Sequence, residues 1–226
     1  DNYNNEAKVM SANINKPRTY WQSVRSRLRR DPVTLTCAGI IIGIVLLSIF
    51  APLIAPANPY DANMLKRLAP IGSPGYPLGA DELGRDMLSR LIYGGRISLM
   101  MGLLPVFLAL LIGASCGLIA GYAGGRTNML IMRTMDVFYA FPSVMLAIAI
   151  SGAIGAGLEN GLLSLTLVFI PPITRVSESI TVQIKSLDFI DAARASGASN
   201  SRIIVSHIIV NALGPIFIYC TSLVSV

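Results

Sequence analysis

The chain has 226 residues, of which 53% are apolar and 13% charged, and its formal net charge at pH 7 is +6. Ordinary soluble domains carry about 25% charged residues, so this composition excludes a typical water-soluble domain. The excess positive charge suits the anionic surface of a membrane. Nucleic acid is not an expected partner, because no basic run is interleaved with aromatic side chains that could stack on bases.

Five segments are predicted to cross a membrane as helices, which takes roughly 20 apolar residues each. Four charge-free runs are long enough: 33–55, 97–122, 137–158 and 208–226. The fifth segment, 161–174, is shorter and would also fit a buried core helix. Its apolar pattern continues through Val176, Ile180 and Ile184, which favours a span.

The distribution of basic residues indicates which connections face the cytoplasm. Seven of the 18 Lys and Arg residues precede the first run, and the connection between the predicted span 137–158 and the segment 161–174 has none. By the positive-inside rule, the N-terminus and the loops 123–136 and 175–207 are cytoplasmic. The expected organisation is a cytoplasmic segment 1–32, a first transmembrane helix 33–56, an external loop 57–96 and a core transmembrane domain 97–226.

Small residues and prolines shape the predicted spans. Gly113, Gly117 and Gly121 recur every four residues and share one helical face, where another helix can approach closely. This face suits either packing inside the bundle or a dedicated subunit interface. Prolines are expected to interrupt or kink three spans, which favours a moving or solvent-lined bundle over a simple anchor. They are Pro105, Pro142, Pro171 and Pro172.

Ionisable side chains lie near the predicted span boundaries. Arg133 and Asp136 are three residues apart, as are Arg175 and Glu178, and this spacing predicts an ion pair within each helix. No carboxylate is expected in the middle of a span, so coupling to a proton gradient has little support.

The sequence predicts no catalytic residue, no metal site and no cofactor in this chain. The segment from Gly124 to Thr127 lacks both the spacing and the lysine of a phosphate-binding loop. His207 is the only histidine, and no triad or metal cluster can be assembled around it. The three cysteines lie in apolar segments, which argues against a disulfide framework. We therefore do not expect an enzyme.

A short polar segment between two apolar runs is one candidate functional element. The sequence from Asp188 to Ala198 predicts a helix with modest apolar faces, broken at Gly197. A helix this short is not stable alone in water. We therefore expect it to dock into a groove on a partner.

A second candidate is the block PLGADELGRDMLSRLIYGGRISLMMG, residues 77–102. After the polar residue Asp81, Leu83, Met87 and Leu91 recur at helical spacing. This pattern predicts an amphipathic helix on the external face of the membrane. It would serve as an elbow that orients the next span or as a contact for a partner.

The short polar segment that begins at Asp188, the first block, resembles the EAA loop of binding-protein-dependent ABC importer permeases. In that loop, EAA is followed by three residues, a glycine, nine residues and a closing group such as I-x-L-P or H-I-L-P. Ala192, Ala193 and Gly197 match the pattern, and Asp191 replaces Glu. The closing group begins at His207, with Ile209 and Val210 in place of Leu and Pro.

The second block resembles the G-T-D-x-x-G-R-D-x-x-S-R-x-x-x-G-x-R-x-S-L signature of the dipeptide, oligopeptide and nickel branch of that family. The signature is typical of the second, C-type permease of each pair. The matching residues are Gly79, Asp81, Gly84, Arg85, Asp86, Ser89, Arg90, Gly94, Arg96, Ser98 and Leu99, and Ala80 replaces Thr. The resemblance extends over residues 20–226.

The resemblance implies an all-α integral membrane protein, a polytopic helical bundle of the type I ABC importer permease kind. Five spans fall in this chain, and a sixth is expected in a continuation beyond residue 226. The first residue is Asp rather than Met, so we also expect the true start to lie upstream. The implied location is a bacterial inner membrane, with the N-terminus in the cytoplasm.

The implied partners are a second homologous permease subunit, two cytoplasmic ABC ATPase subunits that bind ATP and Mg²⁺, and an external substrate-binding protein. The first block would be the coupling helix, which seats in an ATPase groove and carries its motion to the spans. The implied coupling residues are Asp188, Phe189, Ile190, Asp191, Ala192, Ala193, Arg194, Gly197, Ala198 and Ser199.

The implied function is import of dipeptides, oligopeptides or a related small solute. Glutathione, nickel and other metal chelates remain alternative substrates. Two rival interpretations are a secondary transporter driven by an ion gradient and a non-transporting membrane scaffold.

Overall fold

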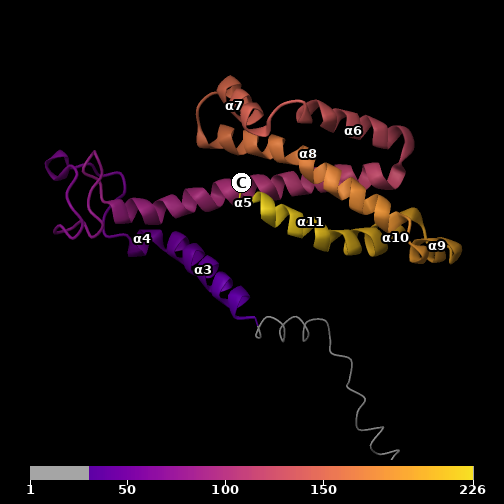
Figure 1. Cartoon of the computed structure of the whole chain (residues 1–226), viewed down its shortest axis with the longest axis horizontal. Helices are drawn as coiled ribbons and strands as arrows, with labels where there is room; N and C mark the ends of the chain where they lie inside the picture. The colour runs from indigo at the N-terminus through magenta and orange to yellow at the C-terminus, as the bar shows by residue number, and fades with distance from the viewer. Residues whose placement is uncertain (1–30, 226) are drawn as a thin grey trace, which may run out of the picture. The chain divides into compact units, whose positions relative to one another are not determined.

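The computed structural model describes residues 31–225, which are predominantly helical (Figure 1). Most of the predicted cytoplasmic segment 1–32 therefore lies outside the described residues. The helices in chain order are α3 (Pro32–Ile49), α4 (Ala51–Ile54), the 3₁₀ turn η1 (Met64–Lys66), α5 (Met87–Ala123), α6 (Gly125–Tyr139), α7 (Ser143–Ile154), α8 (Leu158–Lys185), α9 (Asp188–Ala195), α10 (Asn200–Ile203), the π-helical segment η2 (Ile204–Ile209) and α11 (Val210–Leu223).

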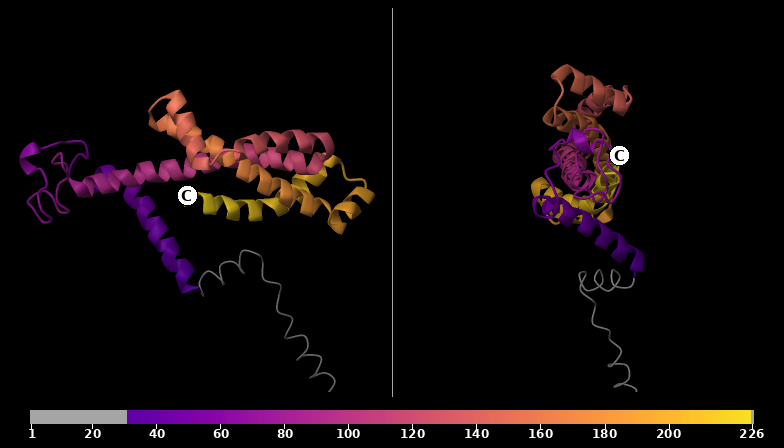
Figure 2. Two further views of the ribbon diagram at one scale, coloured as in Figure 1. Left: turned by 45° about the horizontal axis from the view of Figure 1, so that its top comes forward. Right: turned by 90° about the vertical axis from the view of Figure 1, so that its left-hand side faces the viewer.

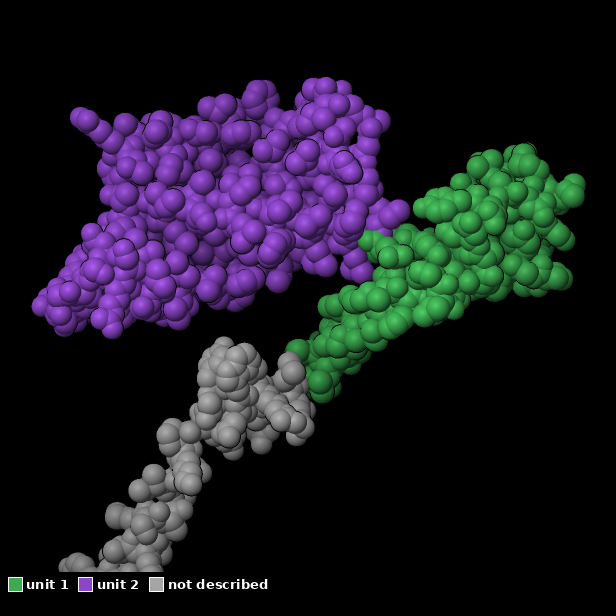
Figure 3. Space-filling model, turned by 180° about the vertical axis from the view of Figure 1, so that it is seen from behind, with its two compact units in different colours: residues 1–96 green, residues 97–226 purple. Residues whose placement is uncertain are grey.

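The chain divides into two compact units, residues 1–96 and 97–226, which Figure 3 colours separately. Within the described residues, four helical stretches are long and apolar enough to cross a membrane, and α6 with α7 makes a fifth if the bent pair counts as one span. The predicted class, a polytopic helical membrane protein, is confirmed.

The first unit contains α3, whose start is set by its sequence. Asp31 caps the helix by accepting from the backbone N–H groups of Val33 and Thr34, at 3.1 and 3.4 Å. Pro32 follows at the first helical position, where its missing N–H leaves no bond unmade. Ser48 is the buried side chain of α3, and it faces Gly95, where a Cβ would stand 2.6 Å from the serine Oγ.

The predicted separate amphipathic helix after Asp81 is not observed. Residues 81–86 form turns, and the helix that follows begins at Met87 and runs without interruption to Ala123. The sequence suggested a boundary near Arg96 because the charge-free run begins there. A charged residue ends an apolar run without breaking the backbone hydrogen bonds of a helix, so the two predicted elements are one.

The second unit is built around α8, which packs against α6, α7 and α11. Its buried core draws apolar residues from five elements besides α8 itself. The core residues are Val106, Ala109, Leu110, Phe169, Ile173, Ile184, Ile190, Ile203, Ile208, Ala212, Ile216 and Cys220. In Figure 1 and the left-hand view of Figure 2, α9 and α10 lie together at one end of α8, where the chain turns back into α11.

The predicted third span, 137–158, is not one helix. α6 ends at Tyr139 and α7 begins at Ser143, and the two helices meet at 85°. Pro142 lies at this break, where its ring disfavours helical geometry at the preceding residue. The predicted loop 123–136 is largely replaced by α6, which begins at Gly125.

The other prolines do not end their helices. Pro105 lies inside α5, and Pro171 and Pro172 lie inside α8. The short fifth segment, 161–174, is part of the 28-residue helix α8, which is long and apolar enough to cross a membrane, as predicted.

Candidate functional site

The short helix α9 has one face buried in the second unit and one face exposed. Ile190 is fully buried in the core, and Ala193 packs against the same cluster. Asp188, Asp191 and Arg194 are exposed, and Arg194 donates to Asp191 at 3.3 Å. The predicted short helix is confirmed, and its inner face is held by this chain itself.

A Schellman motif ends α9 at Gly197. The N–H of Ala198 donates to the carbonyl of Ala193 at 3.0 Å, and the N–H of Gly197 donates to that of Arg194 at 2.9 Å. This motif places its penultimate residue in the left-handed region, and Gly197 has φ +82°. Ala193 and Ala198 both pack against the core, which is the apolar contact that accompanies such motifs. The glycine and its spacing from the alanines thus have a local structural cause.

The segment 186–199, which contains α9, leaves α8 and returns at α10, and we call it the α9 excursion. The two residues that flank it both bond to the end of α5. Lys185, the last residue of α8, donates through Nζ to the carbonyl oxygen of Tyr122 at 2.6 Å. The hydroxyl of Tyr122 donates to Oδ1 of Asn200, the first residue of α10, at 2.7 Å. We call Tyr122, Lys185 and Asn200 the Tyr122 clamp. Sequence reasoning missed it, because no local pattern relates residues so far apart.

The predicted glycine face of α5 lies directly against α8. A Cβ added to Gly113, Gly117 or Gly121 would stand 2.9, 2.4 or 2.7 Å from its nearest atom in α8. Two of these atoms are backbone carbonyl oxygens, those of Ile170 and Thr174, so the helix backbones themselves approach. Of the two uses expected for this face, the described residues show packing within the chain.

The predicted ion pair of Arg175 with Glu178 is not formed. Arg175 instead donates to Asp136 of α6 at 2.5 Å, and its guanidinium stands over the ring of Tyr139 at 4.5 Å. Glu178 accepts from the side-chain amide of Asn128 at 2.6 Å. Both residues reach across to α6 because that helix runs beside α8, which the sequence does not reveal.

The other predicted pair, Arg133 with Asp136, is confirmed at 3.7 Å. Asp136 therefore receives two guanidinium groups, one from its own helix and one from α8. Arg175 also lies well inside α8, which continues to Lys185, rather than at the end of the helix as expected.

An apolar cavity of about 710 Å³ lies in the bend between α6 and α7. Its wall includes Tyr139 and Pro142 at the bend and Phe169, Pro171 and Pro172 on α8. The two α8 prolines lack N–H groups, so two carbonyls one turn earlier lose their usual helical donors. Pro142 thus lies both at the bend and in the wall of this cavity.

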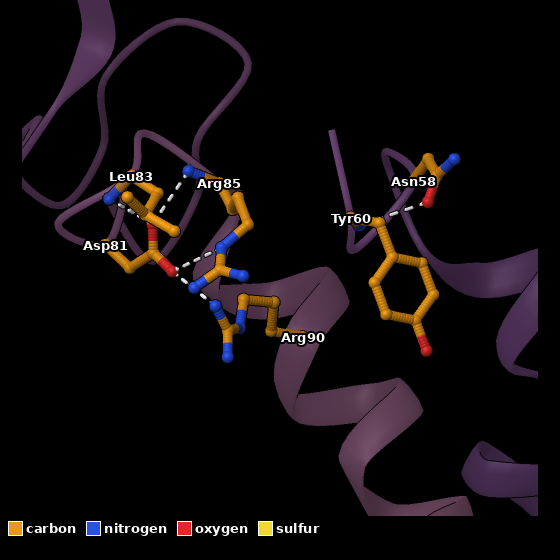
Figure 4. A network of polar contacts seen from close by, with 6 residues as sticks. All are labelled: Asn58, Tyr60, Asp81, Leu83, Arg85 and Arg90. Atoms are coloured by element: carbon orange, nitrogen blue, oxygen red, sulfur yellow. Dashed lines mark hydrogen bonds and ion pairs between the residues drawn. The ribbon is translucent and has the colours of Figure 1, made fainter. Parts of the chain in front are cut away.

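In the first unit, Asp81 holds the turns that precede α5 (Figure 4). Its Oδ1 accepts from the N–H groups of Leu83 and Arg85, both at 2.9 Å, and its Oδ2 accepts from the guanidinium groups of Arg85 and Arg90. Desolvation by burial raises the pKa of Asp81, but the hydrogen bonds and charge of Arg85 and the Leu83 N–H together lower it to about 2.

The signature glycines fit into this same local structure. Gly84 has φ +71°, and a Cβ there would stand 1.8 Å from the carbonyl oxygen of Asn63. Gly79 has φ +79° and approaches the carbonyl of Ala69. At the start of α5, the carboxylate of buried Asp86 accepts from the N–H and hydroxyl of Ser89, at 2.8 and 2.6 Å. Arg96 is exposed and lies outside this network.

No group of three or more possible metal ligands occurs among residues 31–225. Cys37, Cys116 and Cys220 are free thiols. His207 lies in the π-helical segment, with its ring tilted against that of Phe189 at 6.3 Å between centroids.

Two family models match the chain. Residues 113–223 match the binding-protein-dependent transport system inner membrane component, and residues 19–70 match the N-terminal transmembrane domain of oligopeptide transport permease C. The first match contains α9, the glycine face and the Tyr122 clamp.

Curated proteins with similar sequences have names that agree with these models. A dipeptide transport system permease protein, DppC of Alkalihalophilus pseudofirmus, is 37% identical over 89% of this chain and 66% of its own length. A probable D,D-dipeptide transport system permease protein, DdpC of Escherichia coli, is 35% identical over 84% of this chain and 64% of its own length. A glutathione transport system permease protein, GsiD of Pectobacterium atrosepticum, is 32% identical over 89% and 67%.

The chain thus spans just under two thirds of the first two relatives. A putative peptide transport system permease protein of Brucella suis is 35% identical over 85% of this chain and 68% of its own length. This similarity, the two family models and the helical multi-pass structure together establish the family. The chain belongs to the family of binding-protein-dependent transport system inner membrane components, and its residues 19–70 also match the N-terminal transmembrane domain of a permease C.

Proposed function

We propose that this chain is the transmembrane permease subunit of an ATP-driven, binding-protein-dependent importer of dipeptides or short oligopeptides. It works in a bacterial inner membrane with its N-terminus in the cytoplasm. A second homologous permease completes the translocation path, an external binding protein delivers the peptide, and two cytoplasmic ATPase subunits bind ATP and Mg²⁺. The chain itself is not an enzyme.

The observation that carries this proposal is the two-sided character of α9. Its inner face is fixed to the bundle through fully buried Ile190, whereas the charged side chains of Asp188, Asp191 and Arg194 are exposed. A helix fixed on one side and open on the other can take up a push from a partner and pass it to the bundle. We assign this exposed face to an ATPase groove.

The substrate class follows the names of the relatives. Several are called dipeptide or peptide permeases, so peptides are the first candidate cargo. Glutathione is the second candidate because one similar protein is named a glutathione permease. Nickel and other chelates stay open as alternatives on the sequence signature alone.

The proposal is tested by uptake into proteoliposomes that contain both permeases and both ATPases, with the binding protein outside. We expect a labelled dipeptide to accumulate only when ATP, Mg²⁺ and the binding protein are all present. Unlabelled dipeptide should compete, and competition by glutathione alone would shift the assignment to the second candidate. Uptake that persists without ATP and collapses with a protonophore would identify an ion-gradient transporter instead.

The coupling assignment has its own test in the same vesicles. Asp191→Arg reverses the charge of the exposed face of α9, and we expect it to abolish uptake while the protein still inserts into the membrane. Unchanged uptake in this variant would remove α9 from the coupling path.

A further inference from the structure

Both ends of the α9 excursion are attached to one residue of another helix. The excursion leaves α8 after Lys185 and rejoins the bundle at Asn200, and each of these residues bonds to Tyr122 near the end of α5. Residues 186–199 therefore form a loop whose two ends are joined by the Tyr122 clamp.

The clamp joins the ends of three helices by different interactions. The ammonium of Lys185 lies at the C-terminal ends of both α8 and α5, where helix dipoles favour a positive charge. It also stands 5.4 Å from the centre of the Tyr122 ring, within the range of a cation–π contact. The Tyr122 hydroxyl alone makes the bond to α10.

The α9 excursion is itself fixed to the core of the second unit. Ile190 and Ile203 are fully buried on either side of the turn at Gly197, and the Schellman motif closes that turn. Below the clamp, the glycine face brings α5 and α8 into backbone contact. The Tyr122 hydroxyl thus joins a braced loop to a tightly packed helix pair.

We infer that Tyr122 is a positioning residue, which transmits displacement of α9 to α5 by holding Asn200 at the base of the loop. This inference rests on the proposed function, since it concerns how the ATPase motion reaches the bundle. Without the hydroxyl bond, α9 still binds its partner, but α10 shifts against α5 and absorbs part of the movement.

The test compares Tyr122→Phe and Asn200→Ala with the wild-type chain in the complete reconstituted transporter. Tyr122→Phe removes only the hydroxyl and keeps the ring and the carbonyl that meet Lys185. The measured quantity is peptide transported per ATP hydrolysed. Losing one hydrogen bond of about 1 kcal/mol should lower this ratio about fivefold. Asn200→Asp keeps an acceptor oxygen and should retain the wild-type ratio.

Two controls separate positioning from damage to the fold. Tyr219→Phe removes a hydroxyl for which the described residues offer no hydrogen-bond partner, and it should leave the ratio unchanged. In an Asp191→Cys background, a disulfide cross-link to a cysteine introduced in the ATPase groove should form equally well with Tyr122→Phe and with the wild-type tyrosine. A wild-type ratio in both Tyr122→Phe and Asn200→Ala would overturn the inference alone. A wild-type transporter without ATP-dependent uptake would overturn the proposed function, and the inference with it.

Discussion

Gly117 of α5 lies so close to Thr174 of α8 that a Cβ on the glycine would stand 2.4 Å from the threonine carbonyl oxygen. The obstacle is backbone, so it cannot be relieved by a side-chain rotation. The two helices meet along a seam that admits no further atom at this point.

Gly117→Ala should therefore destabilise the protein by forcing the two helices apart. Overpacking of this kind costs about 1–3 kcal/mol, which thermal unfolding in detergent would detect. The matched control is Gly152→Ala in α7, where a Cβ meets no other atom within 4 Å. There the better helix propensity of alanine should stabilise by up to about 1 kcal/mol. Equal melting temperatures for the two variants would contradict the seam.

Gly197 is required for its conformation rather than for its size. A Cβ there has open space, but the φ of +82° disfavours an ordinary side chain by about 1–2 kcal/mol. Gly197→Ala should therefore loosen the end of α9, whereas Gly197→Asn should be tolerated better, since asparagine adopts left-handed geometry more readily. Hydrogen exchange at the Ala198 amide, which donates to Ala193, reports the difference. Faster exchange in the Asn variant than in the Ala variant would be the opposite of this expectation.

Asp81 should make the turns before α5 sensitive to acid. Its pKa is lowered from 3.8 to about 2, so the ionised form is the one that the fold stabilises. That contribution is present above the ordinary pKa and is lost as pH falls through about 2. Asp81→Asn should speed hydrogen exchange at the Leu83 and Arg85 amides at pH 7, and its difference from wild type should shrink between pH 4 and 2.

The control for this prediction is Asp61→Asn, which removes an exposed carboxylate from the same loop. It should leave exchange at both amides unchanged. A pH-independent difference between Asp81→Asn and wild type would show that the charge of Asp81 is not what orders the turns.

Arg175 should be energetically coupled to Asp136 and not to Glu178. Both side chains of the observed pair are close to half exposed, so a double-mutant cycle should give a coupling free energy of only about 0.5–1 kcal/mol. The cycle uses Arg175→Met and Asp136→Asn, singly and together, in thermal unfolding. The parallel cycle with Glu178→Gln should give no coupling. Coupling to Glu178 instead would restore the pairing that residue spacing suggested.

Local features of this molecule were predictable because their causes are local. Asp31 and Pro32 mark the start of α3 through the chemistry of a helix N-terminus. Gly197, three residues after the alanines, marks the end of α9 through the Schellman motif. The glycine face was recognisable because its period matches one side of a helix.

Features that depend on the path of the chain were not predictable. The charge-free run 137–158 hides an 85° bend, since composition alone does not distinguish a kink from a break at Pro142. Arg175 and Glu178 have the spacing of an intrahelical pair, but each reaches a polar partner on α6 instead. The Tyr122 clamp joins residues on three helices and leaves no periodic trace in the sequence.

The sparse attachment of α3 has a consequence for how freely its sequence can change. Its apolar side chains are largely exposed within this chain, and its buried contact is a serine facing Gly95. One apolar residue can replace another along most of α3 without disturbing a neighbour in the described part of the molecule. Ser48 cannot be replaced by a larger residue in the same way, because it already packs closely against Gly95, which has no side chain. Among the described residues, the fully buried contact of α3 is thus confined to one small side chain near its end.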